Sequence, residues 1–412
     1  MNLSRGLSAS LAAGIGVLVM AAASPAAADV VNPQQIFMDG VAGVTGLQAV
    51  RQVVVSPDGK NVYTAGEGQS AITVWSRAHD GSLKEIQVLE DNVGGITGIN
   101  FVDNLSVSPD GRNVYAAGIQ SKTFVTFSRS ASTGELTEVQ VITNGVDVPS
   151  GLNGVVYNAI SPDGKNVYSA ATVDGAVVVF ARNRRTGILS PIQVIEDGVD
   201  GVDGLEGAFP VIVSRDGKNV YVGARTAHNV LVYSRAGNGK LTLIQTLTEG
   251  SDGVRGIDGA RYITEAFEEN VVYVSGIVHS TIAVLARDPA TGELTQIQTL
   301  INHVNATDIN NVTSMVESFD HLHLFATAFG SFALTSFHRD RRTGKLTAQE
   351  QDTFDPGDGS VDPGLIQITS AAMSPGGQNL YTVGFFGGNL NVWRINEKSH
   401  EPGAAEDGNA PE

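Results

Sequence analysis

The sequence contains no cysteine among its 412 residues. This absence excludes disulfide bonds, thiolate-bound zinc, iron–sulfur clusters, c-type haem attachment and thiol nucleophiles. A chain of this kind must be stabilised by burial of apolar side chains, and 412 residues are enough to form a substantial core.

Basic residues are also scarce, with 26 lysines and arginines against 43 aspartates and glutamates, a formal net charge of −17. An acidic surface repels phosphate backbones and anionic lipid headgroups. We therefore expect that the protein neither binds nucleic acid nor inserts into a membrane after signal removal. We predict a small molecule or a protein as its partner.

Long apolar runs are missing except near the start of the chain. Arg5 precedes an apolar segment at 11–23, and three alanines at 26–28 provide a small-residue cleavage site. The segment is short for a membrane span and typical of a secretory signal peptide. We predict a signal peptide at 1–28 and a periplasmic or secreted mature protein.

What the sequence does contain is a repeat that begins with Ser-Pro-Asp-Gly-Lys-Asn-Val-Tyr. Copies, some degenerate, lie at 56–63, 108–115, 161–168, 214–221, 266–273, 318–325 and 374–381. The aromatic residue that ends each copy recurs every 52 to 56 residues. A fixed period of this length indicates an array or a propeller.

Each repeat contains signals for four strands. A β-branched run precedes the Pro-Asp-Gly turn, a second strand follows it, and a third alternating strand ends in arginine, including 390–394 in the last repeat. A Gly-x-Leu turn then starts the fourth strand. The sequence therefore predicts an all-β, seven-bladed β-propeller with four-stranded antiparallel blades.

The seventh repeat lacks a fourth strand, and the missing strand is found at the N-terminus. Residues 35–47 match 193–205, which are a fourth strand and its outgoing loop. We predict that the N-terminal strand supplies the outer strand of the last blade and so removes an open edge. The propeller domain is predicted at 29–396 and a disordered acidic tail at 397–412.

The Ser-Pro-Asp-Gly-Lys-Asn-Val-Tyr motif, the Val-x-Val-Phe-x-Arg strand and the Thr-Gly-x-Leu turn resemble the bacterial lactonase-type seven-bladed propellers. That group includes 6-phosphogluconolactonase-like and 3-carboxymuconate-cyclase-like proteins. The resemblance implies a propeller fold and lactone chemistry. The group's histidine-rich segments at the start of the inner strands have no counterpart here, so no catalytic residue is carried over.

Polar loop residues concentrate in blades four to six. His228, His279 and His303 are candidate general bases or metal ligands, because neutral imidazole serves both roles near neutral pH. Arg225, Arg261 and Asp308 lie in the same arc and are candidate ligand-binding residues. The alternative is that all of these residues are solvated loop side chains.

Counting back twelve residues from each repeat aromatic predicts one ring at the channel mouth. The ring comprises Arg51, Asp103, Val156, Phe209, Arg261, Thr313 and Thr369. Two arginines and an aspartate there suit an anionic small molecule such as a sugar acid. The alternative is that Arg51 and Asp103 simply pair between neighbouring blades.

Two further features are weaker. Asp197, Asp200 and Asp203 alternate with glycines in an interblade loop and are candidate calcium ligands, although Asp-Gly is also ordinary turn chemistry. We predict no other cofactor. Phe329, Phe385 and Phe386 fall in loops of the last two blades, where aromatic side chains can bind a sugar ring or a protein.

Three functions remain open from the sequence. The first is binding of a sugar acid, a lactone or a protein through the loop face. The second is hydrolysis of a lactone by the polar residues of blades four to six. The third is a structural role in the cell envelope.

Overall fold

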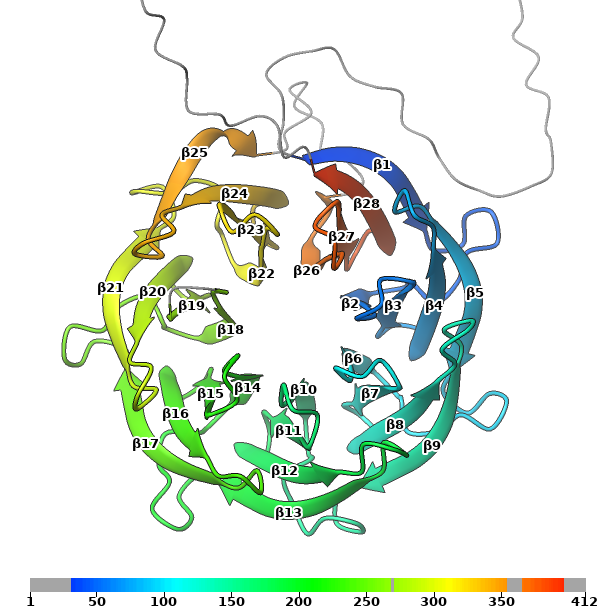
Figure 1. Cartoon of the computed structure of the whole chain (residues 1–412), viewed down its shortest axis with the longest axis horizontal. Coiled ribbons are helices and arrows are strands. Elements are labelled where there is room, and N and C mark those ends of the chain that lie inside the picture. The colour runs from blue at the N-terminus through cyan, green and yellow to red at the C-terminus, as the bar shows by residue number, and fades with distance from the viewer. Residues whose placement is uncertain (1–30, 268–269, 354–364, 396–412) are drawn as a thin grey trace, which may run out of the picture.

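The computed structural model describes residues 31–267, 270–353 and 365–395. Seven four-stranded sheets are arranged around one central axis, and every strand pair is antiparallel (Figure 1). This confirms the predicted seven-bladed β-propeller.

No helix in the described residues has the length and hydropathy of a membrane span. The predicted signal peptide and acidic tail lie outside these residues, and their boundaries stay predictions.

Each blade contributes one strand to each of four concentric positions. The innermost strands are β2 (Val50–Val55), β6 (Val102–Val107), β10 (Val155–Ile160), β14 (Ala208–Val213), β18 (Ala260–Glu265), β22 (Val312–Glu317) and β26 (Ile368–Met373). The second strands are β3 (Asn61–Gly66), β7 (Asn113–Gly118), β11 (Asn166–Ala171), β15 (Asn219–Ala224), β19 (Val271–Gly276), β23 (His323–Ala328) and β27 (Asn379–Gly384). The third strands are β4 (Ala71–Arg77), β8 (Thr123–Arg129), β12 (Ala176–Arg182), β16 (Asn229–Arg235), β20 (Thr281–Arg287), β24 (Ala333–Arg339) and β28 (Asn389–Ile395). The outermost strands are β5 (Leu83–Glu90), β9 (Leu136–Thr143), β13 (Leu189–Glu196), β17 (Leu241–Thr248), β21 (Leu294–Ile301), β25 (Leu346–Thr353) and β1 (Val31–Met38).

The N-terminal strand closes the ring as predicted. β1 pairs with β28 from Val31 opposite Ile395 to Met38 opposite Asn389. The pairing is irregular between Pro33 and Gln35, where proline has no amide hydrogen to donate. The two ends of the fold thus share the seventh blade, where β1 and β28 lie side by side (Figure 1).

The Ser-Pro-Asp-Gly turn is held by its own side chains. Ser56 Oγ donates a hydrogen bond to Asp58 Oδ1 at 2.6 Å and accepts one from the Asn61 amide at 3.0 Å. The same contacts recur at Ser108 and Ser161. The motif is therefore structural in these blades.

The repeat residues of one blade also bind the third strand of the next, through what we call the interblade lock. Arg129 donates to Tyr63 Oη at 2.7 Å, to Asn61 Oδ1 at 2.7 Å and to Asp58 Oδ1 at 2.9 Å. Tyr63 Oη in turn donates to the carbonyl of Gly134 at 3.0 Å. Gly134 has φ +89°, and a Cβ there would lie 2.0 Å from Asn61 Nδ2. The Gly-x-Leu turn therefore requires glycine.

The lock is repeated by Arg182, Arg235 and Arg287, but blade seven departs from it. Arg394, predicted as the terminal arginine of the third strand, pairs opposite Asn379 as Ser76 does opposite Asn61. The prediction for Arg394 was wrong by one residue, because β28 continues to Ile395. Ile395 takes the lock position and packs in one buried cluster with Phe325, which replaces the tyrosine.

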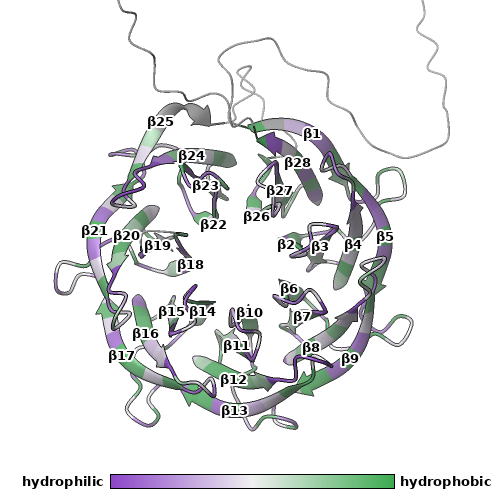
Figure 2. Ribbon diagram, viewed as in Figure 1, coloured by the Kyte–Doolittle hydropathy of each residue, from purple (hydrophilic) through white to green (hydrophobic). Residues whose placement is uncertain are grey.

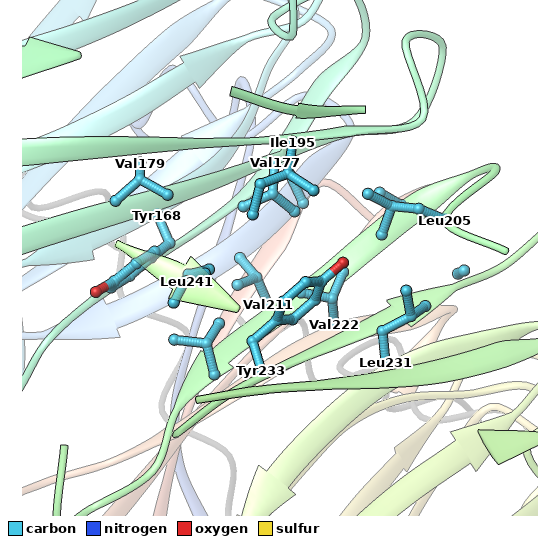
Figure 3. Close-up of a cluster of buried hydrophobic side chains, with 14 residues drawn as sticks. Tyr168, Val177, Val179, Ile195, Leu205, Val211, Val222, Leu231, Tyr233 and Leu241 are labelled. Carbon is cyan, nitrogen blue, oxygen red and sulfur yellow. The ribbon is translucent and has the colours of Figure 1, made fainter. Parts of the chain in front are cut away.

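The hydrophobic core lies between blades. One cluster joins Tyr168, Val177 and Ile195 of the third blade to Val211 and Tyr233 of the fourth (Figure 3). The outer strands alternate between hydrophobic and hydrophilic residues along their length, consistent with one covered and one exposed face (Figure 2). Trp75 and Trp393 are buried at equivalent positions, which confirms that both are packing residues.

Candidate functional site

The seven residues of the predicted ring occupy equivalent positions, because every innermost strand has a bulge at the same place. The pairing of β2 with β3 breaks between Val50 and Gln52, and the six other innermost strands break at the equivalent point. A bulge leaves a residue out of the regular ladder and redirects its side chain. The bulged residues include all seven predicted members: Arg51, Asp103, Val156, Phe209, Arg261, Thr313 and Thr369.

One side of the ring is an ion-pair network. Arg51 Nε lies 3.4 Å from Asp103 Oδ1 of the next blade and also pairs with Glu67, which follows β3. The Arg51 guanidinium lies 4.0 Å from the centre of the Phe385 ring in blade seven. The alternative that Arg51 and Asp103 pair is confirmed, and Arg51 is held from three directions.

The other side of the ring is aromatic. The Arg261 guanidinium lies 4.1 Å from the centre of the Phe209 ring. Tyr157 contacts Phe209 at 5.5 Å and Tyr262 at 6.3 Å between ring centres. Tyr157 belongs to blade three and Tyr262 to blade five, which are not neighbours, so their rings meet towards the axis. We call Arg51, Glu67, Asp103, Tyr157 and Arg261 the axial cluster.

Burial shifts the pKa values of two charged residues in the axial cluster. Burial raises the pKa of Asp103, and the cations Arg51 and Arg261 oppose this shift. Burial lowers the pKa of Arg261, and Asp103 opposes that shift. Arginine remains a cation at neutral pH even so. Within the described residues no carboxylate lies at ion-pair distance from Arg261, which leaves its donors available for an anion.

Two of the three candidate histidines converge on one carboxylate. His228 Nδ1 pairs with Asp258 Oδ1, and His279 Nδ1 lies 2.9 Å from Asp258 Oδ2. Asp258 is only 8% exposed, whereas both imidazoles are largely exposed. We call these three residues the rim cluster. A neutral histidine that donates Nδ1–H to a carboxylate keeps a lone pair on Nε2, the arrangement of a general base.

The repeat provides an internal comparison for this contact. Ser70 Oγ donates to Asn100 Oδ1 at 3.1 Å between blades one and two, and Ser280 Oγ donates to Asn310 Oδ1 at 2.9 Å between blades five and six. Ser70, His228 and Ser280 share the same left-handed backbone position, with φ of 51° to 58°. Two neutral residues suffice for the structural contact, so the ionisable pair at blades four and five exceeds what the fold requires.

The structure places the other arc candidates apart from the rim cluster. His303 is exposed in the next interblade loop, and within the described residues its side chain makes no hydrogen bond or ion pair. Asp308 follows in that loop, where its carbonyl accepts a hydrogen bond from Thr335 Oγ1 at 3.1 Å. Arg225 is exposed, three residues before His228, and its positive charge helps to lower the pKa of Arg261.

The calcium candidates lie in a loop with a repeated hydrogen bond. Asp197 Oδ1 accepts from the Leu205 amide at 2.6 Å, and Asp39, Asp91 and Asn144 make the same contact in their own loops. Asp200 and Asp203 are exposed. In the part of the chain that the structure describes, no three histidine, aspartate or glutamate side chains are arranged to hold a metal. Calcium binding stays a prediction.

Sequence reasoning missed Glu67, Tyr157, Tyr262 and Asp258, although the repeat contained a signal for each position. Counting eleven residues back from the repeat aromatic reaches Tyr157 and Tyr262 in blades three and five. Counting four residues forward reaches Glu67, Arg225 and Phe385. Counting fifteen residues back from the repeat aromatic reaches Asp258, Asn100 and Asn310, but the spacing did not show that two histidines meet at Asp258.

Solved structures with this architecture share few identical residues with the chain. A periplasmic gluconolactonase from Pseudomonas aeruginosa superimposes with a TM-score of 0.61 at 20% identity, covering 78% of this chain and 91% of that one. A protein from Bacteroides uniformis, described as a candidate 6-phosphogluconolactonase, gives 0.60 at 18%, covering 78% and 88%. A chain of the mitotic checkpoint complex gives 0.62 at 16%, covering 92% and 100%. Such different proteins share one scaffold, so this likeness shows the fold alone.

No curated protein matches the sequence significantly. The family profile described as "Lactonase, 7-bladed beta-propeller" matches residues 42–198 and 157–310, which together span more than half of the chain. This match confirms the resemblance that the repeat motifs indicated. The chain therefore belongs to the lactonase family of seven-bladed β-propellers.

Proposed function

We propose that this protein hydrolyses the lactone of a sugar acid at its loop face, between the rim cluster and the axial cluster. The observation that carries the proposal is the convergence of His228 and His279 on the buried carboxylate of Asp258. Membership of the lactonase family and the description of one structural relative as a gluconolactonase support the substrate class.

The two clusters supply complementary parts of the chemistry. An imidazole that is oriented by Asp258 can take a proton from water through Nε2 while the water oxygen attacks the lactone carbonyl. The same imidazole then returns the proton to the ring oxygen as the ester bond breaks. Arg225 and Arg261 can stabilise the negative charge that develops on the carbonyl oxygen and remains on the product carboxylate.

The proposal predicts that restoring the repeat's neutral contact abolishes turnover without harming the fold. The variant carries His228→Ser, His279→Ser and Asp258→Asn, so that a serine and an asparagine meet as in the neighbouring blades. We expect kcat for aldonolactone hydrolysis to fall by about 10²-fold or more, the usual contribution of a general base. A pH-indicator assay on 1,4- and 1,5-aldonolactones, with and without a 6-phosphate, measures this loss.

His303→Ser is the matched control, because His303 is exposed and lies apart from the rim cluster. It should keep the wild-type rate, and both variants should keep the wild-type melting temperature within a few degrees. Equal turnover in the triple variant and the wild type would remove the rim cluster from the reaction. Absence of turnover by the wild type on every lactone would reject the hydrolase.

A second candidate function, binding of a sugar acid without turnover, is favoured by Arg261. This half-buried cation lies against an aromatic ring and has no carboxylate at ion-pair distance in the described residues. Asp103 competes with an anionic ligand for the positive charge of Arg261, because Asp103 and Arg261 shift each other's pKa.

Affinity for an aldonate should therefore depend on the charge of Asp103. Because burial raises the pKa of Asp103, this carboxyl takes up its proton at a higher pH than an ordinary aspartate. Protonation removes a negative charge beside Arg261, so affinity should rise as pH falls towards the ordinary carboxyl range. Asp103→Asn should bind the aldonate about 3- to 10-fold more tightly at pH 7, by about 1 kcal/mol, and lose this pH dependence. Calorimetric titration of both proteins from pH 8 to pH 5 measures the affinity and its pH dependence. Weaker aldonate binding by Asp103→Asn than by the wild type would contradict this account.

The place of action is part of the proposal. The signal-like segment at 1–28 and the periplasmic relative from Pseudomonas aeruginosa support an exported protein. Fractionation of cells that express the full chain, with mass spectrometry of the mature N-terminus, tests this.

A further inference from the structure

Tyr157 occupies a position that has a structural task in other blades. It is the third residue of β10, and the third residues of β2, β6, β22 and β26 each accept a hydrogen bond from a backbone amide of the next blade. Those residues are Gln52, Asn104, Ser314 and Ser370, which accept from Leu105, Asn158, Ala371 and Val53. The position therefore normally joins neighbouring innermost strands.

Tyr157 performs no such task. Its ring is fixed by Phe209 and Tyr262, but its hydroxyl forms no hydrogen bond within the described residues. Tyr262, the equivalent residue of blade five, differs because Ser314 acts on its phenol and opposes the rise in pKa that burial causes. Tyr157 is half-buried and its hydroxyl is not sealed from solvent, so a ligand can reach it.

The surroundings of Tyr157 favour an oxygen ligand. Arg261 and Asp103 both interact electrostatically with its phenol, which places the phenol inside the axial cluster. Burial, and to a smaller extent Tyr262, raise the pKa of Tyr157 well above its usual value. The phenol therefore stays protonated at physiological pH and can act only as a neutral donor or acceptor there.

We propose that Tyr157 is a catalytic residue that donates a hydrogen bond to the carbonyl oxygen of the lactone, with Arg261 beside it. This inference rests on the proposed hydrolase. Water adds to the carbonyl carbon and gives its proton to the rim imidazole, while the carbonyl oxygen becomes negative. The ring C–O bond then breaks, the leaving oxygen takes the proton from the imidazole, and Tyr157 keeps its own proton throughout. Donors aimed at such an oxygen typically contribute 10²- to 10³-fold to kcat.

Tyr157→Phe tests the inference, because it removes the hydroxyl and keeps the ring contacts. We expect kcat to fall by about 10²-fold and KM to change by less than about 3-fold. The loss should be the same from pH 5 to pH 9, since Tyr157 does not titrate there; variants of the rim histidines should instead change the shape of the pH profile. Tyr262→Phe is the matched control and should keep most of the activity.

The outcomes separate the two proposals. Turnover by the wild type with an unaffected kcat in Tyr157→Phe would overturn the role of Tyr157 and leave the hydrolase standing. A wild type that opens no aldonolactone would overturn both. An equal loss in Tyr262→Phe and Tyr157→Phe, with lowered melting temperatures, would assign the effect to packing and overturn the inference.

Discussion

A chain that begins at Asp39 should fail to fold into a monomeric propeller. Without β1, the blade seven edge strand β28 exposes an unpaired row of backbone groups, which is a template for aggregation. Phe37 is also lost from the buried cluster that joins blades seven and one, where its ring centre lies 4.8 Å from that of Trp75. Size-exclusion chromatography and circular dichroism of the truncated and complete mature chains measure the outcome.

β1 also supplies one of the contacts that tie each outer strand to the next blade. The Leu83 amide donates to Gln35 Oε1 at 2.9 Å, as the Leu136 amide donates to Gln87 Oε1 at 2.8 Å. The truncated ring therefore loses pairing, packing and this contact together. A truncated chain that stays monomeric and melts with the wild type would show that closure does not depend on β1.

A milder change isolates the packing contribution of this strand. Phe37 is only 4% exposed, so Phe37→Ala should lower the free energy of unfolding by about 3–5 kcal/mol. Val41, four residues later and 50% exposed, is the control, and Val41→Ala should cost less than about 0.5 kcal/mol. Urea denaturation of both variants gives the comparison.

Loss of one interblade lock should also lower the free energy of unfolding by several kcal/mol. Arg182 has a fully buried side chain that donates to Tyr115 Oη at 2.7 Å, Asn113 Oδ1 at 2.8 Å, Asp110 Oδ1 at 2.9 Å and the Gly164 carbonyl at 3.0 Å. Arg182→Ala leaves these acceptors without their donor. Breaking a buried pair from one side costs about 3–5 kcal/mol, which urea denaturation should detect.

One natural junction between blades lacks the lock and provides the model for a control variant. Between blades six and seven, Phe325 and Ile395 replace the tyrosine and arginine of the lock with apolar residues in one buried cluster. The double variant Tyr115→Phe with Arg182→Ile copies the tyrosine and arginine positions of that junction, although Asn113 stays where the junction has His323. It should recover part of the stability that Arg182→Ala loses, because apolar pairs of similar volume often replace buried ion pairs at little cost. A double variant less stable than Arg182→Ala would contradict this explanation.

The arginine of the third strand shows where sequence reasoning stops. The repeat pattern made Arg394 the terminal arginine of the third strand, since it ends an alternating run as the other arginines do. Only the register of β28 against β27 shows that Ile395 holds that position. A one-residue change of register moves a side chain to the other face of a strand, and composition alone does not reveal it.

The candidate site divides in the same way. Arg51, Asp103 and Arg261 could be grouped from spacing, because each innermost strand has its bulge at the same distance from the repeat aromatic. His228 and His279 could be named as candidates but not placed together. Asp258 occupies the repeat position of Asn100 and Asn310, but only the folded loops show that both histidines reach its carboxylate.

The sequence by itself determined the number of blades, the order of the four strands in each and the closure by the N-terminal strand. These follow from local turn chemistry, side-chain alternation and a constant period, all of which are written along the chain. The tertiary structure alone decided which side chains meet at the axis and at the rim. Tyr157 and Tyr262 come from blades three and five and touch only because the ring closes, so their contact is a property of the whole fold.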